Sequence, residues 1–386
     1  MSDPIIQAPI VKGPIVKGWC PGAYQPMMSG DGLVVRVRPY QAELSRAQIL
    51  GLCGAALRYG SGMIDLTNRA NLQIRGVRPD RHTALLAELH RLNLLDPDAA
   101  TEARRNILVT PFYQTGDLGE RLSRALVDRL ADLPDLPAKF GFVIDTGPTR
   151  VLSDCSGDIR LETGSDGGLI LRADGAETGL NVSESRAIDQ LIDLANWFAD
   201  AGAGAGVRRM ARLLHRRAIS RRWRGAAPAA LASAPLPGRT PYGRLYGVPF
   251  GQIDAASLSG LINQSDTRAL RVTPWRLFLI DGDDPDQSHG FLTEPDDPLS
   301  GVDACSGAPY CPQATVETRA IARQLAARVN GTLHVSGCAK GCARASPANI
   351  TLVGRNTTFD LVTHGCAGDE PAQQGLTPET LLAMKF

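Results

Sequence analysis

Four cysteines near the C-terminal end of the chain are spaced for metal chemistry. Five residues separate Cys305 from Cys311, and three separate Cys338 from Cys342. Four thiolates are the usual ligands of an iron–sulfur cluster, whereas structural zinc favours pairs only two to four residues apart. A glycine on either side of Cys338 lets the backbone approach a sulfur closely. We therefore predict a 4Fe–4S cluster at these cysteines, with zinc or unligated thiols as the alternatives.

The segment after Cys311 predicts a helix over about 313–329. Pro312 suits the first helical position, and apolar residues such as Ile321 and Leu325 recur at helical spacing. The N-terminus of a helix carries partial positive charge and lowers the pKa of a nearby thiol. We therefore expect this helix to stabilise the Cys311 thiolate.

Composition excludes several classes of protein. Of the 386 residues, 43% are hydrophobic and 21% are charged, and the formal net charge is +1. These values are ordinary for a folded protein of two or three domains and give no overall nucleic-acid footprint. No apolar stretch approaches the roughly 18 residues of a membrane span, and the first residues lack a secretory pattern. We therefore expect a cytoplasmic protein without nucleic-acid or membrane partners, whose cysteines are thiols or metal ligands rather than disulfides.

Two stretches far apart in the chain share a pattern. A proline–aromatic step at 39–40 is followed by a helix and a strand at 67–76, and the same order recurs at 249–250 and 273–282. Both strand segments begin with threonine and end with glycine. We interpret the pattern as a strand–helix–strand unit used twice, which would give two half-domains that pair around a cleft. Chance similarity is the alternative.

Local patterns predict three further elements. Ser45 and Gln48 form a capping box for a helix over about 46–59, and alternating apolar residues predict a strand over 63–74. Residues 208–224 hold eight arginines and no acid, and an apolar stripe predicts a helix there as well. We interpret this basic helix as solvated, with a docking surface for an acidic partner as the alternative.

The cysteine pattern and three other segments resemble the sulfite and nitrite reductase family. The segments are ThrAsnArgAlaAsnLeuGlnIleArgGly at 67–76, ArgAsnIle at 105–107 and LeuProAlaLysPhe at 136–140. The resemblance covers most of 18–386 and implies duplicated ferredoxin-like half-domains. In that family the cysteine in the position of Cys342 also bridges the cluster to the iron of a sirohaem.

The reductases of this family surround a small inorganic anion with arginines and a Lys-x-Lys pair. The resemblance assigns this role to Arg69, Arg105 and Lys139, but Gly141 stands where the second lysine would be. Anion reduction needs cations around one small oxyanion, so Gly141 weakens sirohaem-dependent sulfite or nitrite reduction, which remains the alternative function. A non-catalytic electron carrier is disfavoured, because it needs no convergent cations.

Two more segments resemble a branch of the family that serves the aerobic synthesis of cobalamin. They are TrpCysProGlyAla at 19–23 with MetSerGlyAspGlyLeu at 28–33, and HisValSerGlyCysAlaLysGlyCysAla at 334–343. This resemblance implies a monooxygenase that hydroxylates the tetrapyrrole precorrin-3A with dioxygen and closes a γ-lactone. It also implies a 4Fe–4S cluster, a non-haem iron and electrons that come ultimately from NADH. The glycines at 202–206 do not form a dinucleotide fingerprint, so we expect a separate electron-donating protein.

A substrate with many carboxylates needs several fixed cations, and arginine binds carboxylate at two points. Arg69, Arg105 and Lys139 could supply them. Arg69 and Arg75 would share one face of a regular strand, so Arg75 is a fourth candidate, and a solvated sheet face is the alternative. His334, just before the second cysteine pair, is the candidate ligand for the non-haem iron, which usually takes two histidines and a carboxylate. A structural histidine is the alternative.

We therefore predict an α+β protein with duplicated ferredoxin-like half-domains and α/β modules that carry a 4Fe–4S cluster. The expected divisions are an extended arm at 1–17, a half-domain at 18–98, an α/β module with the basic helix at 99–224, a linker at 225–241, a second half-domain at 242–300 and an iron–sulfur module at 301–386.

Overall fold

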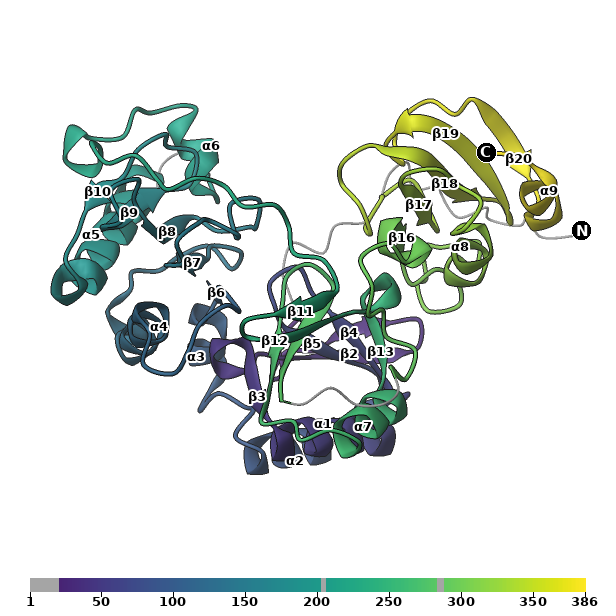
Figure 1. Cartoon of the computed structure of the whole chain (residues 1–386), viewed down its shortest axis with the longest axis horizontal. Coiled ribbons are helices and arrows are strands. Elements are labelled where there is room, and N and C mark those ends of the chain that lie inside the picture. Colours follow the sequence, from purple (N-terminus) through teal and green to yellow (C-terminus); the bar gives the residue numbers. More distant parts are fainter. Residues whose placement is uncertain (1–20, 203–205, 283–287) are drawn as a thin grey trace, which may run out of the picture. The chain divides into compact units, whose positions relative to one another are not determined.

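A computed structural model describes residues 21–202, 206–282 and 288–386 (Figure 1). The chain divides into two compact units, and each is described by itself. Within the described ranges, the larger unit comprises 21–28 and 32–296, and the smaller comprises 29–31 and 297–386. The predicted arm at 1–17 lies outside the described residues. None of the helices in the described part is long and apolar enough to cross a membrane.

Two five-stranded sheets form the first part of the larger unit. One has the strand order β1-β2-β5-β4-β13, and the other has the order β11-β12-β15-β14-β3. The strands of the first sheet are β1 (Met27–Ser29), β2 (Gly32–Val37), β4 (Met63–Leu66), β5 (Leu72–Val77) and β13 (Gln252–Asp254). Those of the second are β3 (Glu43–Ser45), β11 (Gly238–Thr240), β12 (Gly243–Gly247), β14 (Ala269–Val272) and β15 (Leu277–Asp281).

Each half lends one short strand to the sheet of the other. Strand β3 from the first half pairs antiparallel with β14, and β13 from the second half pairs antiparallel with β4. Helix α1 (Arg46–Tyr59) follows β3, helix α7 (Ala255–Asn263) follows β13, and the two helices pack together. Helix α2 (His82–Arg91) packs beside α1. One continuous apolar core runs through both halves, so neither half-domain completes its sheet or its core alone.

The backbone confirms the internal repeat in detail. Gln41 lies two residues before the start of β3, and Phe250 lies two residues before the start of β13. Both have positive φ. Ala70 and Arg276, each three residues after the threonine of its copy, have φ of 52° and 58°. Such backbone is uncommon for residues other than glycine, so its recurrence indicates duplication. The turns also correct the predicted strand over 63–74, which is a hairpin of β4 and β5.

An α/β module completes the larger unit. Its sheet has the order β10-β9-β8-β7-β6. The pairs β6–β7 and β7–β8 are parallel, and the pairs β8–β9 and β9–β10 are antiparallel. A second apolar core lies between this sheet and its helices. The strands are β6 (Ile107–Val109), β7 (Phe142–Asp145), β8 (Ile159–Thr163), β9 (Leu169–Ala173) and β10 (Leu180–Asn181). The helices are α3 (Ala99–Arg104), α4 (Leu118–Asp128), α5 (Glu184–Gly202) and α6 (Met210–Leu214).

The basic segment and the predicted linker differ from expectation. The helix predicted over 208–224 is only the five-residue α6, followed by a 3-10 turn at Arg221–Trp223. The Ala/Pro-rich segment at 225–241 is not a loose linker. Its backbone bonds to the α/β module, with Ala226 bridging Gly179 and Ala229 donating to the carbonyl of Thr163. Small residues allow this close backbone approach.

The smaller unit is built on one sheet with the order β16-β17-β18-β19-β20. The pairs β16–β17 and β17–β18 are parallel, and the pairs β18–β19 and β19–β20 are antiparallel. This is the pattern of the other α/β module. The α/β module is therefore also present twice. The strands are β16 (Val302–Ala304), β17 (Leu333–Ser336), β18 (Ala348–Arg355), β19 (Thr358–Gly365) and β20 (Gln373–Leu376), and the helices are α8 (Arg319–Leu325) and α9 (Pro378–Ala383).

Candidate functional site

Both cysteine pairs lie at the same edge of the sheet in the smaller unit. Cys305 directly follows β16, and Cys338 follows β17 by two residues. Because β16 and β17 are parallel neighbours, their carboxyl ends bring the two pairs together. The helix predicted over 313–329 begins only at Arg319. Cys311 therefore sits in a turn, its N–H bonded to the carbonyl of Gly307, and the predicted helix-dipole stabilisation was wrong.

The backbone around the cysteines is shaped for sulfur. The N–H of Gly337 donates to Sγ of Cys305 at 3.1 Å. A side chain at Gly337 would bring its Cβ within 2.6 Å of the Cβ of Ala314, so only glycine fits there. Gly341 has a φ of +62°, which favours glycine. N–H···S bonds of this kind occur around iron–sulfur clusters and tune their potentials.

The charges of the thiols are coupled. Desolvation raises the pKa of the Cys342 thiol, Lys340 opposes this, and negative charge on the other three cysteines raises it further. The sulfur of Cys342 therefore lies close enough to the other three to feel their charge. In the described residues, no three His, Cys, Asp or Glu side chains converge on a single ion. Four thiolates are the donors that an iron–sulfur cluster takes.

His334 lies beneath the second cysteine pair. It is on β17 and fully buried, and in register beside it are Asp303 on β16 and Thr351 on β18. A Cβ built on Gly341 would lie 3.7 Å from its Cε1. Among the residues that the structure describes, no group of three His, Cys, Asp or Glu side chains that could hold an iron forms at His334. The role of His334 as an iron ligand stays a prediction.

Arg344 ties the loop of the second cysteine pair to the sheet. Its Nη1 donates to Oδ2 of Asp303 at 2.9 Å, and its Nε donates to the carbonyl of Pro347 at 3.1 Å. Its own N–H donates to the carbonyl of Gly341 at 3.3 Å. The ion pair is largely shielded from solvent, with side-chain exposures of 25% and 19%. These contacts hold the loop that carries Cys342.

A second group of candidate residues meets in the larger unit. Arg69 lies in the turn between β4 and β5, and its Nη2 donates to the carbonyl of Lys139 at 2.9 Å. The same nitrogen donates to Oγ of Ser156 at 3.0 Å. Lys139 is exposed and directly precedes the buried Phe140. The structure therefore brings Arg69 to the backbone of Lys139, although the two residues are seventy residues apart in the chain.

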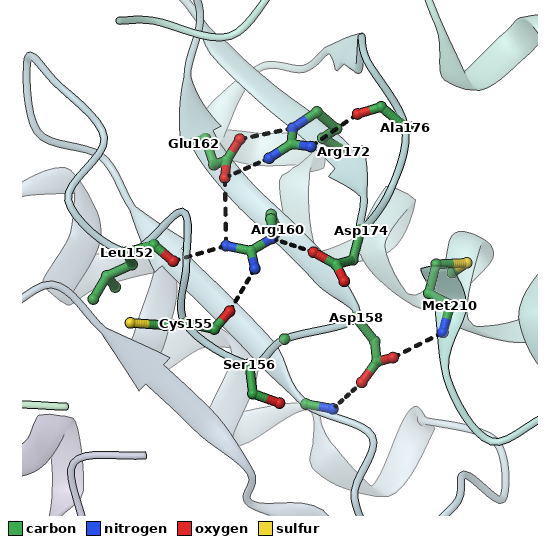
Figure 2. Close-up of polar contacts among 12 residues, drawn as sticks. Leu152, Cys155, Ser156, Asp158, Arg160, Glu162, Arg172, Asp174, Ala176 and Met210 are labelled. Atoms are coloured by element: carbon green, nitrogen blue, oxygen red, sulfur yellow. Dashed lines mark hydrogen bonds and ion pairs between the residues drawn. The ribbon is translucent and has the colours of Figure 1, made fainter. Parts of the chain in front are cut away.

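Arg209 joins this group from the basic segment. Its Nε donates to both oxygens of Asp158, at 2.9 and 3.1 Å, and its Nη2 donates to Oγ of Ser156 at 3.0 Å. Asp158 is fully buried. It also accepts from the N–H of Met210 (Figure 2) and from the N–H of Gly141. Burial raises the pKa of Asp158, and the hydrogen bond from Arg209 opposes this. Ser156 thus accepts from Arg69 and Arg209 on one oxygen atom.

Gly141, which replaces the family's second lysine, is held by its surroundings. Its N–H donates to Oδ2 of Asp158 at 3.0 Å, and its carbonyl accepts from the N–H of Asp158 at 2.7 Å. A Cβ at this position would lie 2.9 Å from Nδ2 of Asn106. This backbone leaves little room for a side chain at 141.

Arg105 is engaged by the fold. Its Nε and Nη2 donate to the two oxygens of Asp96 at 2.7 and 2.8 Å, with side-chain exposures of only 5% and 2%. Its Nη2 also donates to the carbonyl of Arg38, and its guanidinium lies 4.1 Å from the ring centre of Tyr40. The carbonyl of Asp96 in turn accepts from the hydroxyl of Tyr24. The family resemblance made Arg105 a candidate for substrate binding, but its contacts in the structure are those of a residue that holds the fold.

Arg75 does not share a face with Arg69 as expected. Arg69 precedes the strand, whereas Arg75 lies within β5 and is 8% exposed. Its Nε lies 3.6 Å from Oδ2 of Asp65 on the neighbouring strand β4. The expectation assumed one regular strand through both residues, and the turn at Ala70 breaks that regularity.

A buried charge network supports the loop that carries Ser156 (Figure 2). Arg160 on β8 is 2% exposed. Its Nη1 donates to the carbonyl of Leu152 at 3.0 Å, and its Nη2 donates to that of Cys155 at 2.6 Å. Its Nε donates to Asp174 at 2.9 Å, and the fully buried Glu162 lies 3.7 Å from its Nη1. The loop before Asp158 is therefore fixed from below by one side chain.

Two residues of this site, Ser156 and Arg209, were not predicted. Arg209 was included only as one arginine of a solvated helix, and Ser156 had no local signal. They lie 53 residues apart and meet Arg69 only through tertiary contacts. The run of arginines at 208–209 was the one sequence signal for Arg209, but it could not distinguish this arginine from its exposed neighbours.

Comparisons with known proteins agree with this fold. Residues 25–92 match the family of the nitrite/sulfite reductase ferredoxin-like half domain. Among solved structures, Mycobacterium tuberculosis NirA protein superposes with a TM-score of 0.63, covering 91% of this chain and 79% of that chain. The identity is 17%, so this likeness concerns the fold alone. The fold and this half-domain match place the chain in the nitrite/sulfite reductase-like class of folds.

Two curated relatives refine the assignment. A precorrin-3B synthase from Sinorhizobium sp is 30% identical over 403 residues, which cover 92% of this chain and 84% of the relative. The ferredoxin–nitrite reductase of Synechococcus elongatus is 24% identical, over 89% of this chain and 80% of the relative. The chain belongs to the precorrin-3B synthase family. It is accordingly an oxidoreductase.

Proposed function

We propose that this protein is a monooxygenase that converts precorrin-3A to precorrin-3B in cobalamin synthesis. One atom of dioxygen enters the substrate as a hydroxyl on the meso carbon between rings A and D, and the ring A acetate closes a γ-lactone. The other oxygen atom leaves as water, with two electrons that come ultimately from NADH and two protons. The observation that carries the proposal is the 30% identity to a precorrin-3B synthase over 92% of the chain.

Arg69 and Lys139 support a substrate with carboxylates. The Nη2 of Arg69 is fixed by the Lys139 carbonyl and by Ser156, so the guanidinium is oriented before an anion arrives. A fixed guanidinium loses little side-chain entropy on binding and can grip a carboxylate at two points. In this proposal Arg69 and Lys139 bind carboxylates of the macrocycle. Arg105 and Arg75 are positioning residues, because both are nearly buried against acids of the fold.

The four cysteines would hold a 4Fe–4S cluster. Such a cluster supplies single electrons at a potential set partly by hydrogen bonds to its sulfurs. The chain's own contribution is to present Cys305, Cys311, Cys338 and Cys342 at one sheet edge and to aim the N–H of Gly337 at Cys305. We infer that a separate protein delivers the electrons, because the chain has no dinucleotide fingerprint.

Gly141 argues against the alternative, a sirohaem-dependent reductase of sulfite or nitrite. Such an enzyme concentrates cations on one small oxyanion, and a lysine at 141 would be crowded by Asn106. The weaker match to a nitrite reductase, at 24% identity, agrees with this ranking.

The test starts with an anaerobic ultraviolet–visible spectrum and acid extraction of the purified protein. We expect a broad iron–sulfur band and no extractable sirohaem, followed by oxygen-dependent conversion of precorrin-3A in the presence of a reductase and NADH. Arg69→Ala should lose substrate binding while it keeps its iron and sulfide content. A sirohaem chromophore together with sulfite or nitrite reduction would overturn the proposal.

A further inference from the structure

Arg69 and Arg209 share a single acceptor. Each donates through Nη2 to Oγ of Ser156 at 3.0 Å. The two Nη2 atoms are therefore separated by no more than the length of two hydrogen bonds. They come from segments far apart in sequence, the β4–β5 turn and the residue before α6. Like charges at this separation repel each other. An anion bound between them would relieve that repulsion.

The guanidinium of Arg209 is held in place by some of its N–H donors, while the donors of Nη1 stay available. Its Nε is held by the buried Asp158, and its Nη2 is held by Ser156 and by the carbonyl of Gly157 at 3.1 Å. Among the residues that the structure describes, none accepts a hydrogen bond from Nη1 of Arg209. The side chain is 32% exposed. One face of a preoriented guanidinium is therefore presented to solvent with donors available.

Three cationic side chains belong to this group. They are Arg69, Arg209 and Lys139, and the acid Asp158 binds Arg209 through Nε. Asp158 is fully buried and saturated by backbone N–H groups and by Arg209. It can orient Arg209, but it cannot turn toward a ligand.

The support of Ser156 makes the arrangement rigid. Arg160 binds the carbonyls of Leu152 and Cys155, directly before Ser156 (Figure 2). Arg160 is itself fixed by Asp174 and lies close to Glu162. The hydroxyl that both arginines share is therefore held by a loop with little freedom. Rigid donors of this kind bind carboxylates at a lower entropic cost.

We propose that Arg209 and Arg69, bridged by Ser156, form a two-arginine subsite for one carboxylate of a polycarboxylate tetrapyrrole. This inference rests on the proposed function, and it adds Arg209 as a determinant of substrate affinity. A guanidinium suits a flat carboxylate that it can grip at two points. The subsite therefore selects substrates by the number and placement of their acid side chains.

The test uses direct binding of stable porphyrins to the whole protein by fluorescence titration. Uroporphyrin carries an acetate and a propionate on every ring, and coproporphyrin lacks the acetates. We expect Arg209→Gln to weaken uroporphyrin binding by about tenfold or more, the usual loss for a charged hydrogen-bonded contact. Arg209→Lys should fall between wild type and Arg209→Gln, because it keeps the charge but loses the two-point geometry.

Arg212→Gln is the matched control. Arg212 is an exposed arginine of the same segment, so its substitution removes the same charge and should change affinity by less than about twofold. Equal weakening by Arg209→Gln and Arg212→Gln would overturn the subsite. If Arg209→Gln does not fold, wild-type-like binding by a folded Arg209→Lys or Ser156→Ala variant would overturn it as well.

Turnover separates this inference from the proposed function. With precorrin-3A and oxygen, we expect Arg209→Gln to raise KM and to leave kcat within about threefold. If the wild type converts precorrin-3A and Arg209→Gln has the same KM as the wild type, the subsite alone would be overturned. Failure of the wild type to convert precorrin-3A, with porphyrin binding still weakened by Arg209→Gln, would overturn the proposed function and leave the subsite standing.

Discussion

The N–H of Gly337 points at Sγ of Cys305 from a distance of 3.1 Å. A methyl group on Gly337 would meet Ala314 at 2.6 Å, so the backbone could not keep this approach. We expect Gly337→Ala to lower the cluster content of the purified protein substantially, as measured by iron and sulfide analysis. Gly368→Ala is the control, because nothing lies within 4 Å of a Cβ there. Equal cluster content in both variants would contradict the role of this hydrogen bond.

Substitution of His334 tests the iron assignment. His334 is buried beside the loop of the second cysteine pair, so His334→Ala should loosen that loop and reduce the amount of cluster. The ratio of iron to acid-labile sulfide should stay at the wild-type value, because iron and sulfide leave together with the cluster. A selective loss of iron without sulfide would show that His334 binds a separate iron after all.

The ion pair of Arg105 and Asp96 is expected to hold the fold. Removal of one partner leaves a buried charge unpaired, which costs about 3 kcal/mol or more. Arg105→Gln and Asp96→Asn should therefore each lower the thermal unfolding midpoint, and by similar amounts. If Arg105→Gln instead left the midpoint unchanged and abolished porphyrin binding, Arg105 would be a substrate ligand, as the sequence motif suggested.

Asp145 is expected to make stability depend on pH. Its side chain is fully buried, and burial raises the pKa of its carboxyl to about 6, while the bond from the Leu152 N–H opposes this. The folded state therefore binds the proton more tightly than the unfolded state does. This contribution is complete below about pH 4 and is lost as pH rises through 6, at a cost of about 3 kcal/mol for two pKa units.

Asp145→Asn removes the titration at nearly constant shape. We expect this variant to unfold at a higher temperature than wild type at pH 8, by a smaller margin at pH 5, and at nearly the same temperature below about pH 4. The exposed Asp128 provides the control substitution, Asp128→Asn, which should shift the midpoint little at either pH. A destabilised Asp145→Asn variant at pH 8 would mean that the ionised carboxylate contributes favourably to the fold.

Patterns within one short segment were predicted well. The capping box of Ser45 and Gln48 is present, and the helix runs over Arg46–Tyr59 as expected. The repeat of the half-domains was visible because both copies keep a proline–aromatic turn and a threonine at the next turn. In contrast, a helix was predicted over 313–329, and the structure has only α8 at Arg319–Leu325. The reason is that apolar residues at regular spacing also occur in turns that pack on a sheet.

The roles of the cations could not be read from neighbouring residues. Arg69, Arg105 and Arg75 all belong to short sequence motifs, but their partners differ. Arg69 meets a serine and a carbonyl, whereas Arg105 meets a buried acid and Arg75 a half-buried one. An arginine becomes a binding group or a structural one according to the partner that the fold brings to it. Asp96 lies 9 residues from Arg105, whereas Lys139 and Ser156 lie 70 and 87 residues from Arg69.

By itself, the sequence determined the four-cysteine donor set, the duplication and the family resemblance, because each is encoded by residue type and spacing along the chain. Only the tertiary structure decided that β3 and β13 are exchanged between the halves and that Arg105 is buried with Asp96. It also decided that Arg209 and Arg69 converge on Ser156. The physical reason is that strand pairing, burial and charge partners depend on contacts between distant segments, and no local pattern specifies which segments meet.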